Sequence, residues 1–114
     1  PKEYLPDFIR GFFEAEGCVR WCKSHYTRKL KRGGAVRSCF SQNRRDLLTF
    51  IHQALLSSGI VKGGFVTTQH SNFLLEFGIV DSISLYHYLY DNYHELYLQP
   101  KRLRFEELLE RQVA

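Results

Sequence analysis

Two glutamates stand near the end of an unusually apolar segment, and the second of them, Glu16, is followed directly by a glycine. Residues 5–15 repeat apolar side chains at helical spacing, and Gly17 is a natural helix terminator. Residues 18–23 have the pattern of an extended strand. Glu16 is therefore expected at a helix-to-strand corner. Carboxylates that meet in pairs at the bottom of a basic groove select hard divalent cations such as Mg²⁺.

The expected helix over residues 5–16 is apolar around roughly 200° of its circumference, about twice the stripe of a surface helix. One hydrophobic core does not need so much apolar surface, so we expect one flank in the core and the other against a second copy of the chain. Gly11 and Ala15 lie one turn apart, and their small size would let a second backbone approach closely. The predicted dimer interface contains Phe8, Gly11, Phe12 and Ala15.

Basic residues are concentrated in one quarter of the chain, although the net charge of the whole is only +4. No Asp or Glu occurs between Gly17 and Arg45. Exposure of these basic residues to solvent is the simpler explanation, but a stretch that carries only positive charges fits better with binding to a polyanion such as nucleic acid. The basic residues of this stretch are Arg20, Lys23, Arg28, Lys29, Lys31, Arg32, Arg37, Arg44 and Arg45.

Length and composition indicate one globular domain over residues 1–114, since 44% of the residues are hydrophobic and 15% are aromatic. No apolar run approaches the roughly 20 residues that cross a bilayer, so no membrane partner is expected. Three cysteines, Cys18, Cys22 and Cys39, are an odd number and favour an intracellular, reducing setting. A zinc site is disfavoured because Cys18 and Cys22 would lie about 13 Å apart on a strand.

Alternating and helical patterns predict an α+β fold with the order αββαββα and an additional C-terminal helix, in which helices cover one face of a four-stranded antiparallel curved sheet. After the first helix we expect strands over 18–26 and 35–42, joined by a basic loop over 27–34. A helix capped by Asn43 should follow and end near residues 57–59, before strands over 60–69 and 72–79. A third helix, capped by Asp81 or Ser82, should extend to Tyr93, and Pro100 should begin the last helix.

Residues 9–17, Ile-Arg-Gly-Phe-Phe-Glu-Ala-Glu-Gly, resemble the LAGLIDADG motif that names a family of homing endonucleases. The likeness holds at both glycines, at the alanine and in the character of the two acidic positions. Later segments resemble the family in order and spacing, namely Phe40-Ser41-Gln42, Leu47-Leu48, Ser58-Gly59-Ile60 and Pro100-Lys101-Arg102. The resemblance covers nearly the whole chain and implies the LAGLIDADG homing-endonuclease fold.

The resemblance also implies a metal site. At the second acidic position of the motif the family binds a divalent cation, which here assigns Glu16 as a ligand of Mg²⁺, with Mn²⁺ as a substitute. The carbonyl of Ala15 is the second expected ligand, and Glu14 is expected to be structural. The usual residue at the metal position is aspartate, and a glutamate reaches one methylene further.

The implied activity is hydrolysis of DNA phosphodiesters by a metal-bound or metal-adjacent water. Lys101, or its neighbour Arg102, matches a basic residue of the family that approaches the scissile phosphate, and Gln42 matches a position that orders water near the metal. One motif per chain implies a homodimer, which would cut both strands of a long, near-palindromic duplex and leave short 3′ overhangs.

Base contacts are expected from one face of the sheet, because a two-stranded ribbon fits the major groove. The residues expected there are Arg20, Cys22, Ser24, Tyr26, Arg37, Thr67 and Gln69. A slip of one residue in the register would exchange the two faces. Phosphate contacts are expected from Arg28, Lys29, Lys31, Arg32, Arg44 and Arg45.

Two other functions fit parts of the pattern. A catalytically inactive LAGLIDADG-type protein would keep the DNA-binding residues and act as a regulator, or as a maturase that binds intron RNA. A module for single-stranded RNA is suggested by seven tyrosines and nine phenylalanines, since aromatic rings stack on bases. Most of these rings, however, fall on positions expected to be buried.

Overall fold

The computed structural model of the chain describes residues 2–23, 34–92 and 100–113. A short 3₁₀ turn (Lys2–Tyr4) leads into helix α1, and the order of elements confirms the predicted αββαββα fold with its C-terminal helix. The elements are α1 (Leu5–Glu16), β1 (Gly17–Lys23), β2 (Gly34–Gln42), α2 (Arg45–Ser57), β3 (Phe65–Gln69), β4 (Asn72–Phe77), α3 (Ile79–Tyr90) and α4 (Pro100–Val113). The expected strand residues 24–26, the loop residues 27–33 and Tyr93 lie outside the described residues.

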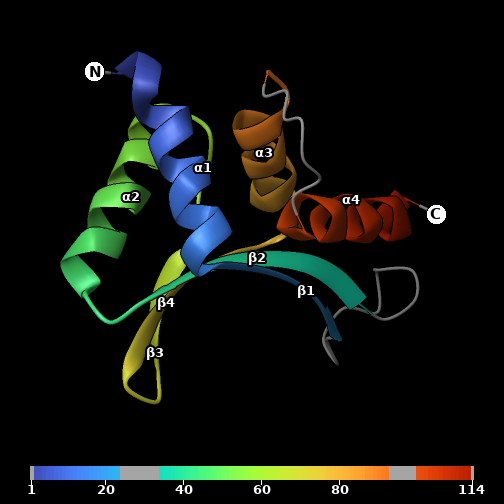
Figure 1. Cartoon of the computed structure of the whole chain (residues 1–114). Coiled ribbons are helices and arrows are strands. Elements are labelled where there is room, and N and C mark those ends of the chain that lie inside the picture. Colours follow the sequence, from blue (N-terminus) through green and yellow to red (C-terminus); the bar gives the residue numbers. More distant parts are fainter. Residues whose placement is uncertain (1, 24–33, 93–99, 114) are drawn as a thin grey trace.

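The described strands form one antiparallel sheet in the order β1-β2-β4-β3, so β2 and β4 are the inner strands. Helices α1 to α4 all lie on the same side of this curved sheet, and its other side carries none of the described helices (Figure 1). The predicted arrangement of helices on one face is therefore confirmed. In the described parts of the chain, no helix combines the length and apolar character that crossing a bilayer requires.

An aromatic cluster forms the centre of the core between the sheet and the helices. The ring of Phe40, from β2, lies 5.4 Å from that of Phe13 in α1 and 6.4 Å from that of Phe77 in β4. Phe13 also lies 5.8 Å from Phe105 of α4. All four side chains are fully buried. These contacts join the first helix, the two inner strands and the last helix.

The second helix begins one residue later than predicted. Asn43 lies before the helix, the N-cap position is Arg44, and no side chain caps α2 there. Instead, the Asp46 carboxylate in the first turn accepts the backbone N–H of Leu47 at 3.0 Å. One of the unpaired amides of the helix start is thus satisfied from within the helix rather than by the preceding asparagine.

Strand β3 is shorter than predicted, because residues 60–64 form a loop instead of its first half. The backbone amides of Lys62 and Gly63 donate to the two oxygens of Asp81, at 3.0 and 2.9 Å, and not to a neighbouring strand. Gly64 has a φ of +105°, a conformation that suits glycine and breaks the strand. A side chain of α3 therefore takes the hydrogen bonds that the sheet would have supplied.

The boundary between β4 and α3 was also placed too late. Strand β4 ends at Phe77, so Ile79 belongs to the helix, and the N-cap position is Gly78 rather than Asp81 or Ser82. Ser82 is fully buried, and its hydroxyl hydrogen-bonds to that of Ser38 at 2.7 Å. Neither Asp81 nor Ser82 therefore caps the helix. Ser82 contacts the sheet through Ser38, and Asp81 binds the loop before β3.

Phe40→Ala tests the role of the central ring. The substitution should lower the free energy of unfolding by about 3–5 kcal/mol, because it leaves a cavity among three other rings. Urea denaturation followed by circular dichroism measures the change. Leu103→Ala, at a residue that is 39% exposed, is the control and should change the stability far less; equal losses in the two variants would contradict the assigned centre of the core.

Candidate active site and nucleic-acid interface

The corner between α1 and β1 depends on Gly17. Its backbone N–H donates to the carbonyl oxygen of Phe13 and ends the helix, and its own conformation is already extended. A Cβ atom at this position would lie 2.5 Å from that oxygen and 2.3 Å from the Phe13 ring. Only glycine therefore lets the chain turn so tightly from helix to strand. Glu16, the last residue of α1, is exposed at this corner as predicted.

Lys101 lies at the same corner. It belongs to the first turn of α4, and its Nζ atom donates to the Phe13 carbonyl oxygen at 3.3 Å. The C-terminal end of a helix carries partial negative charge, which favours a nearby cation. The fold thus brings the two predicted catalytic residues, Glu16 and Lys101, to one end of α1 although 85 positions separate them in the sequence.

The oxygen donors at this corner fit a hard divalent cation. The Glu16 side chain is exposed, and Ala15 lies in the last turn, where helix carbonyls have no intrahelical partner. Carboxylate and carbonyl oxygens are the ligands that Mg²⁺ prefers. Across residues 2–23, 34–92 and 100–113, no group of three or more His, Cys, Asp or Glu side chains could hold a metal ion. One chain therefore offers part of a coordination shell.

Glu14 points elsewhere. Its carboxylate accepts a hydrogen bond from the Tyr90 hydroxyl of α3, and Tyr90 is fully buried. Burial, and then this hydrogen bond, raise the pKa of Tyr90. The contact ties α1 to α3, which agrees with the expectation that Glu14 is structural.

Gln42 lies at the end of β2, two residues beyond Phe40, which is the cross-strand partner of Gly17. It is therefore at the same end of the sheet as the corner. Its side-chain oxygen accepts the backbone N–H of Asn43 at 2.9 Å. The expected role in ordering water stays a prediction.

The register of the sheet assigns the predicted base-contacting residues to the side without helices. Arg20 pairs with Arg37 and Cys22 with Ala35 across β1 and β2, whereas the helix-facing positions are core residues such as Val19 and Phe40. On the outer strand, Thr67 and Gln69 fall on this same face, opposite Leu74 and Asn72. We call this surface the open face. Ser24, Tyr26, Arg28, Lys29, Lys31 and Arg32 lie outside the described residues.

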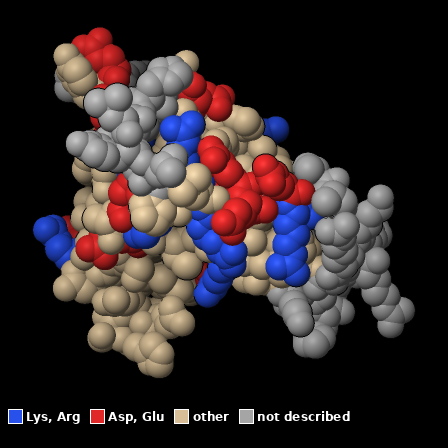
Figure 2. Space-filling view, turned by 45° about the vertical axis from the view of Figure 1, so that its right-hand side comes forward, with Lys and Arg blue, Asp and Glu red and all other residues tan. Residues whose placement is uncertain are grey.

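The two arginines expected to contact phosphates stand at the start of α2. Arg44 forms an exposed ion pair with Asp46, with Nη2 at 2.8 Å from the carboxylate, and an exposed pair of this kind adds little stability. The guanidinium of Arg45 lies over the ring of Phe73, 5.9 Å from its centre. On the face seen in Figure 2, acidic side chains gather in one contiguous group near the middle, with basic side chains along its lower edge.

Sequence reasoning missed one charged residue of the open face. Glu76 of β4 is 9% exposed, and its carboxylate accepts a hydrogen bond from Nη2 of Arg20 at 2.8 Å. The sequence did contain a sign of this position. Glu76 alternates with the apolar residues Phe73, Leu75 and Phe77, and this alternation places Glu76 on the face of the strand opposite to theirs. Which basic residue it meets depends on the order of the strands, which the alternation does not specify.

A pair of thiols was missed as well. Cys18, which is exposed, and Cys39, which is buried, are direct cross-strand partners next to the corner. A hydrogen bond between the two thiols lowers the pKa of Cys18 to about 6, and the positive charges of Arg20 and Lys101 act in the same direction against burial. The same hydrogen bond, with burial, raises the pKa of Cys39.

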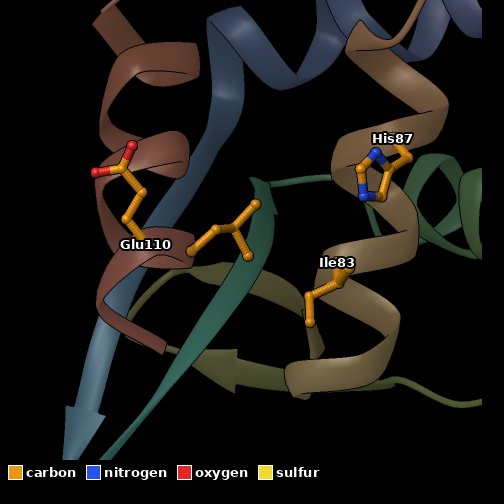
Figure 3. A pocket seen from close by; sticks show the side chains of 4 residues that line it. Ile83, His87 and Glu110 are labelled. Atoms are coloured by element: carbon orange, nitrogen blue, oxygen red, sulfur yellow. The ribbon is translucent and has the colours of Figure 1, made fainter. Parts of the chain in front are cut away.

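A hollow between α3 and α4 lies on the helical side of the molecule and away from the open face. It has a volume of about 310 Å³ and is lined by Ile83, His87, Leu109 and Glu110 (Figure 3). The His87 ring is engaged with Asp91, 2.8 Å away, within α3. With its largely aliphatic lining, this hollow has no arrangement of groups suited to phosphodiester chemistry.

Comparisons with known proteins identify the family and agree with the fold. The profile of a protein family described as a LAGLIDADG-like domain matches residues 3–109. A search of curated protein sequences found no match. Among solved structures, the chain is similar to an archaeal intron-encoded homing endonuclease, I-Vdi141I, in complex with DNA, with a TM-score of 0.70, 21% identity, and coverage of 99% of this chain and 71% of that one.

Two further structures are similar in fold. The homing endonuclease I-TnaI gives a TM-score of 0.66 at 20% identity, over 95% of this chain and 71% of that one. The homing endonuclease I-CvuI in complex with a DNA target gives 0.69 at 18% identity, over 96% of this chain and 66% of that one. At these identities the likeness shows the shared fold.

The lowered pKa of Cys18 predicts selective alkylation. With a pKa of about 6, the thiolate dominates at pH 7, so iodoacetamide should label Cys18 before the buried Cys39. The rate should rise with a midpoint near pH 6, and Arg20→Ala should move the midpoint upward because it removes a neighbouring positive charge. Mass spectrometry of peptides from a pH series measures the rates. A Cys18 midpoint at the ordinary thiol value of about 8.5 would contradict the assignment.

Proposed function

We propose, since the chain belongs to the LAGLIDADG-like domain family, that it is a site-specific homing endonuclease. In this proposal the chain acts as a homodimer and makes a metal-dependent double-strand break in a long, near-palindromic duplex. The observation that carries the proposal is the position of Glu16, exposed at the end of a helix whose outer flank is free for a second copy. The fold of the DNA-bound relatives I-Vdi141I and I-CvuI supports duplex DNA as the partner.

The outer flank of α1 has the properties of a helix–helix interface. Phe8 is 44% exposed, and one turn further a Cβ atom added at Gly11 would meet nothing within 4 Å. Ala15, after another turn, is also exposed. Phe12 is the exception among the predicted interface residues, because it is half-buried and its ring lies 5.7 Å from that of Phe40 in its own core.

Aromatic side chains extend this flank beyond α1. Phe50 of α2 is 56% exposed, and its ring lies 6.4 Å from that of Phe8. With Tyr4 and Leu5, these two rings line a shallow hollow of about 390 Å³. Contiguous exposed aromatic surface of this kind marks sites of protein association. A second copy, related by two-fold symmetry, would bury it against the same residues.

Pairing along this flank would place two copies of Glu16 at a shared centre, because the residue follows Ala15 directly at the end of α1. Two glutamates and two Ala15 carbonyls would then complete the set of oxygen ligands that a single chain lacks. A bound Mg²⁺ ion would lower the pKa of water and stabilise the charge that develops on the phosphoryl group. Each Glu16 would serve one strand of the duplex.

Lys101 would contribute a positive charge beside the scissile phosphate. The residue is half-buried and its Nζ atom donates to the Phe13 carbonyl, so the ammonium group stays at the corner without a bound substrate. A charge held in place before the reaction needs no reorganisation when negative charge develops in the transition state. Arg102 is a weaker candidate, since its guanidinium is engaged with Glu106 and lies over the Tyr90 ring.

Glu16→Gln tests the metal-dependent activity. The variant should lose cleavage by at least about a hundredfold, because it removes an anionic ligand, while it should still bind duplex DNA. A randomised duplex library, incubated with the protein first in Ca²⁺ to measure binding and then in Mg²⁺ to measure cleavage, separates the two properties.

Lys101→Met should also lower cleavage and retain binding, which makes it the matched second variant. If the unaltered chain binds duplex DNA in both metals and never cuts it, the catalytically inactive alternative is correct. Preference for single-stranded RNA over duplex DNA would contradict both DNA-binding functions.

Gly11 allows a test of the dimer that does not depend on cleavage. Gly11→Ala should raise the stability of the isolated fold by about 1 kcal/mol, because the site is an open helix position. Gly11→Leu should fold as well, yet separate the two helices and convert the dimer to a monomer. Sedimentation equilibrium measures the mass. A single-chain mass for the unaltered protein, both with and without duplex DNA, would overturn the homodimer.

A further inference from the structure

Glu76 is an acidic side chain on the open face, where the proposed function would bring a polyanion. The residue is 9% exposed and its side chain is 12% exposed, so the carboxylate is largely removed from water. Burying a charge is costly unless it is paired and hydrogen-bonded. A negative charge here also opposes DNA binding, so its presence calls for a specific partner on the same face.

That partner is Arg20, and the ion pair crosses the sheet. Arg20 lies on β1 opposite Arg37, and Glu76 lies on β4 opposite Cys39. Since β1 and β4 both flank β2 and neighbouring strands are about 4.8 Å apart, the two side chains span about 10 Å over the inner strand. The bridge is diagonal, because Glu76 is level with Cys39 and Arg20 is level with Arg37, two residues away on β2; Cys39 is only 4% exposed.

The contact fixes one end of the Arg20 guanidinium and leaves the rest accessible. Nη2 donates to Glu76 at 2.8 Å, whereas the side chain of Arg20 as a whole remains 43% exposed. Its Nε atom is buried, with no hydrogen-bond partner in the part of the chain that the structure describes. One nitrogen of the guanidinium is therefore held by Glu76, while part of the side chain stays accessible on the open face.

We propose that Glu76 is a positioning residue that holds Arg20 in one orientation towards the major groove and thereby sets a preference for guanine at one position of each half-site. The inference rests on the proposed function. An arginine that is free to move reaches phosphate oxygens, which carry no sequence information, whereas a fixed one can be aligned with the edge of a base.

The position of the preferred base pair follows from the strand. Arg20 lies four residues after Glu16, which corresponds to about 13 Å along β1. Since duplex DNA rises 3.4 Å per base pair, this base pair should lie within about four to six base pairs of the cleaved phosphates. The outer ends of the target should not depend on Glu76.

Variants of Arg20 and Glu76 test the inference through binding alone. Arg20→Ala, Glu76→Val and the double variant are each mixed with a randomised duplex library in Ca²⁺, and the bound sequences are determined. Guanine should be preferred by about 5- to 150-fold at one symmetric pair of positions in the unaltered protein. Arg20→Ala and Glu76→Val should both reduce this preference to within about threefold, and the double variant should resemble Arg20→Ala. Glu76→Gln keeps a hydrogen-bond acceptor and should retain an intermediate preference.

The salt dependence of binding separates positioning from a structural role. If Glu76→Val releases Arg20 to a phosphate, the slope of log affinity against log salt should steepen by about one unit for each half-site. Glu107→Gln is the matched control, because it removes one acidic charge from the exposed pair with Arg104 of α4, on the helical side (Figure 1), and should leave every base preference and the salt slope unchanged. Thermal unfolding of each variant identifies any loss of fold.

The outcomes distinguish this inference from the proposed function. If the unaltered protein enriches no duplex sequence, the proposed function fails and the inference fails with it. If it enriches a target but Glu76→Val changes no preference, weakens all positions equally, or alters positions that Arg20→Ala leaves unchanged, the positioning role is wrong and the function stands.

Discussion

The structure depends on the close contact between Gly17 and Phe13 at the end of α1. The Phe13 carbonyl accepts the hydrogen bonds that end the helix and anchor Lys101, while the Phe13 ring packs into the centre of the core. A single residue thus joins the core, the turn into β1 and the predicted catalytic lysine. Because glycine alone fits against it, the position of Glu16 is set by packing rather than by the flexibility of a loop.

Helix α1 serves two surfaces at once. Ile9 and Phe13 are fully buried in the core, whereas Phe8, Gly11 and Ala15 remain on the outer side. The buried Arg10 is accommodated because its guanidinium donates to the Leu89 carbonyl at 2.8 Å and contacts Asp7. This hydrogen bond ties α1 to α3 and orients the outer flank. The helix is therefore held firmly enough by its own chain to present the other flank to a partner.

On the described part of the open face, an acidic residue lies beside one of the arginines. Arg20 and Arg37 are direct cross-strand neighbours, a like-charged pairing that is unfavourable by itself. Glu76 supplies the opposing charge from two strands away. Composition predicted a basic surface, but it did not indicate that this acidic residue would contact one of the arginines. The contact between Arg20 and Glu76 therefore depends on the order of the strands.

The sequence by itself determined the class of fold, the order of its elements and the corner at Glu16. The class of fold and the order of elements depend on local periodicity. The corner depends on Gly17, which ends the helix and can be recognised from the residues next to it in the sequence. Tertiary structure alone decided that Asp81 holds a loop, that Ser82 contacts Ser38, and that Cys18 faces Cys39. Side chains with several available partners are assigned by the packing of distant segments. Hydrophobic alternation specifies which face a strand buries, but it does not specify which strand lies beside it.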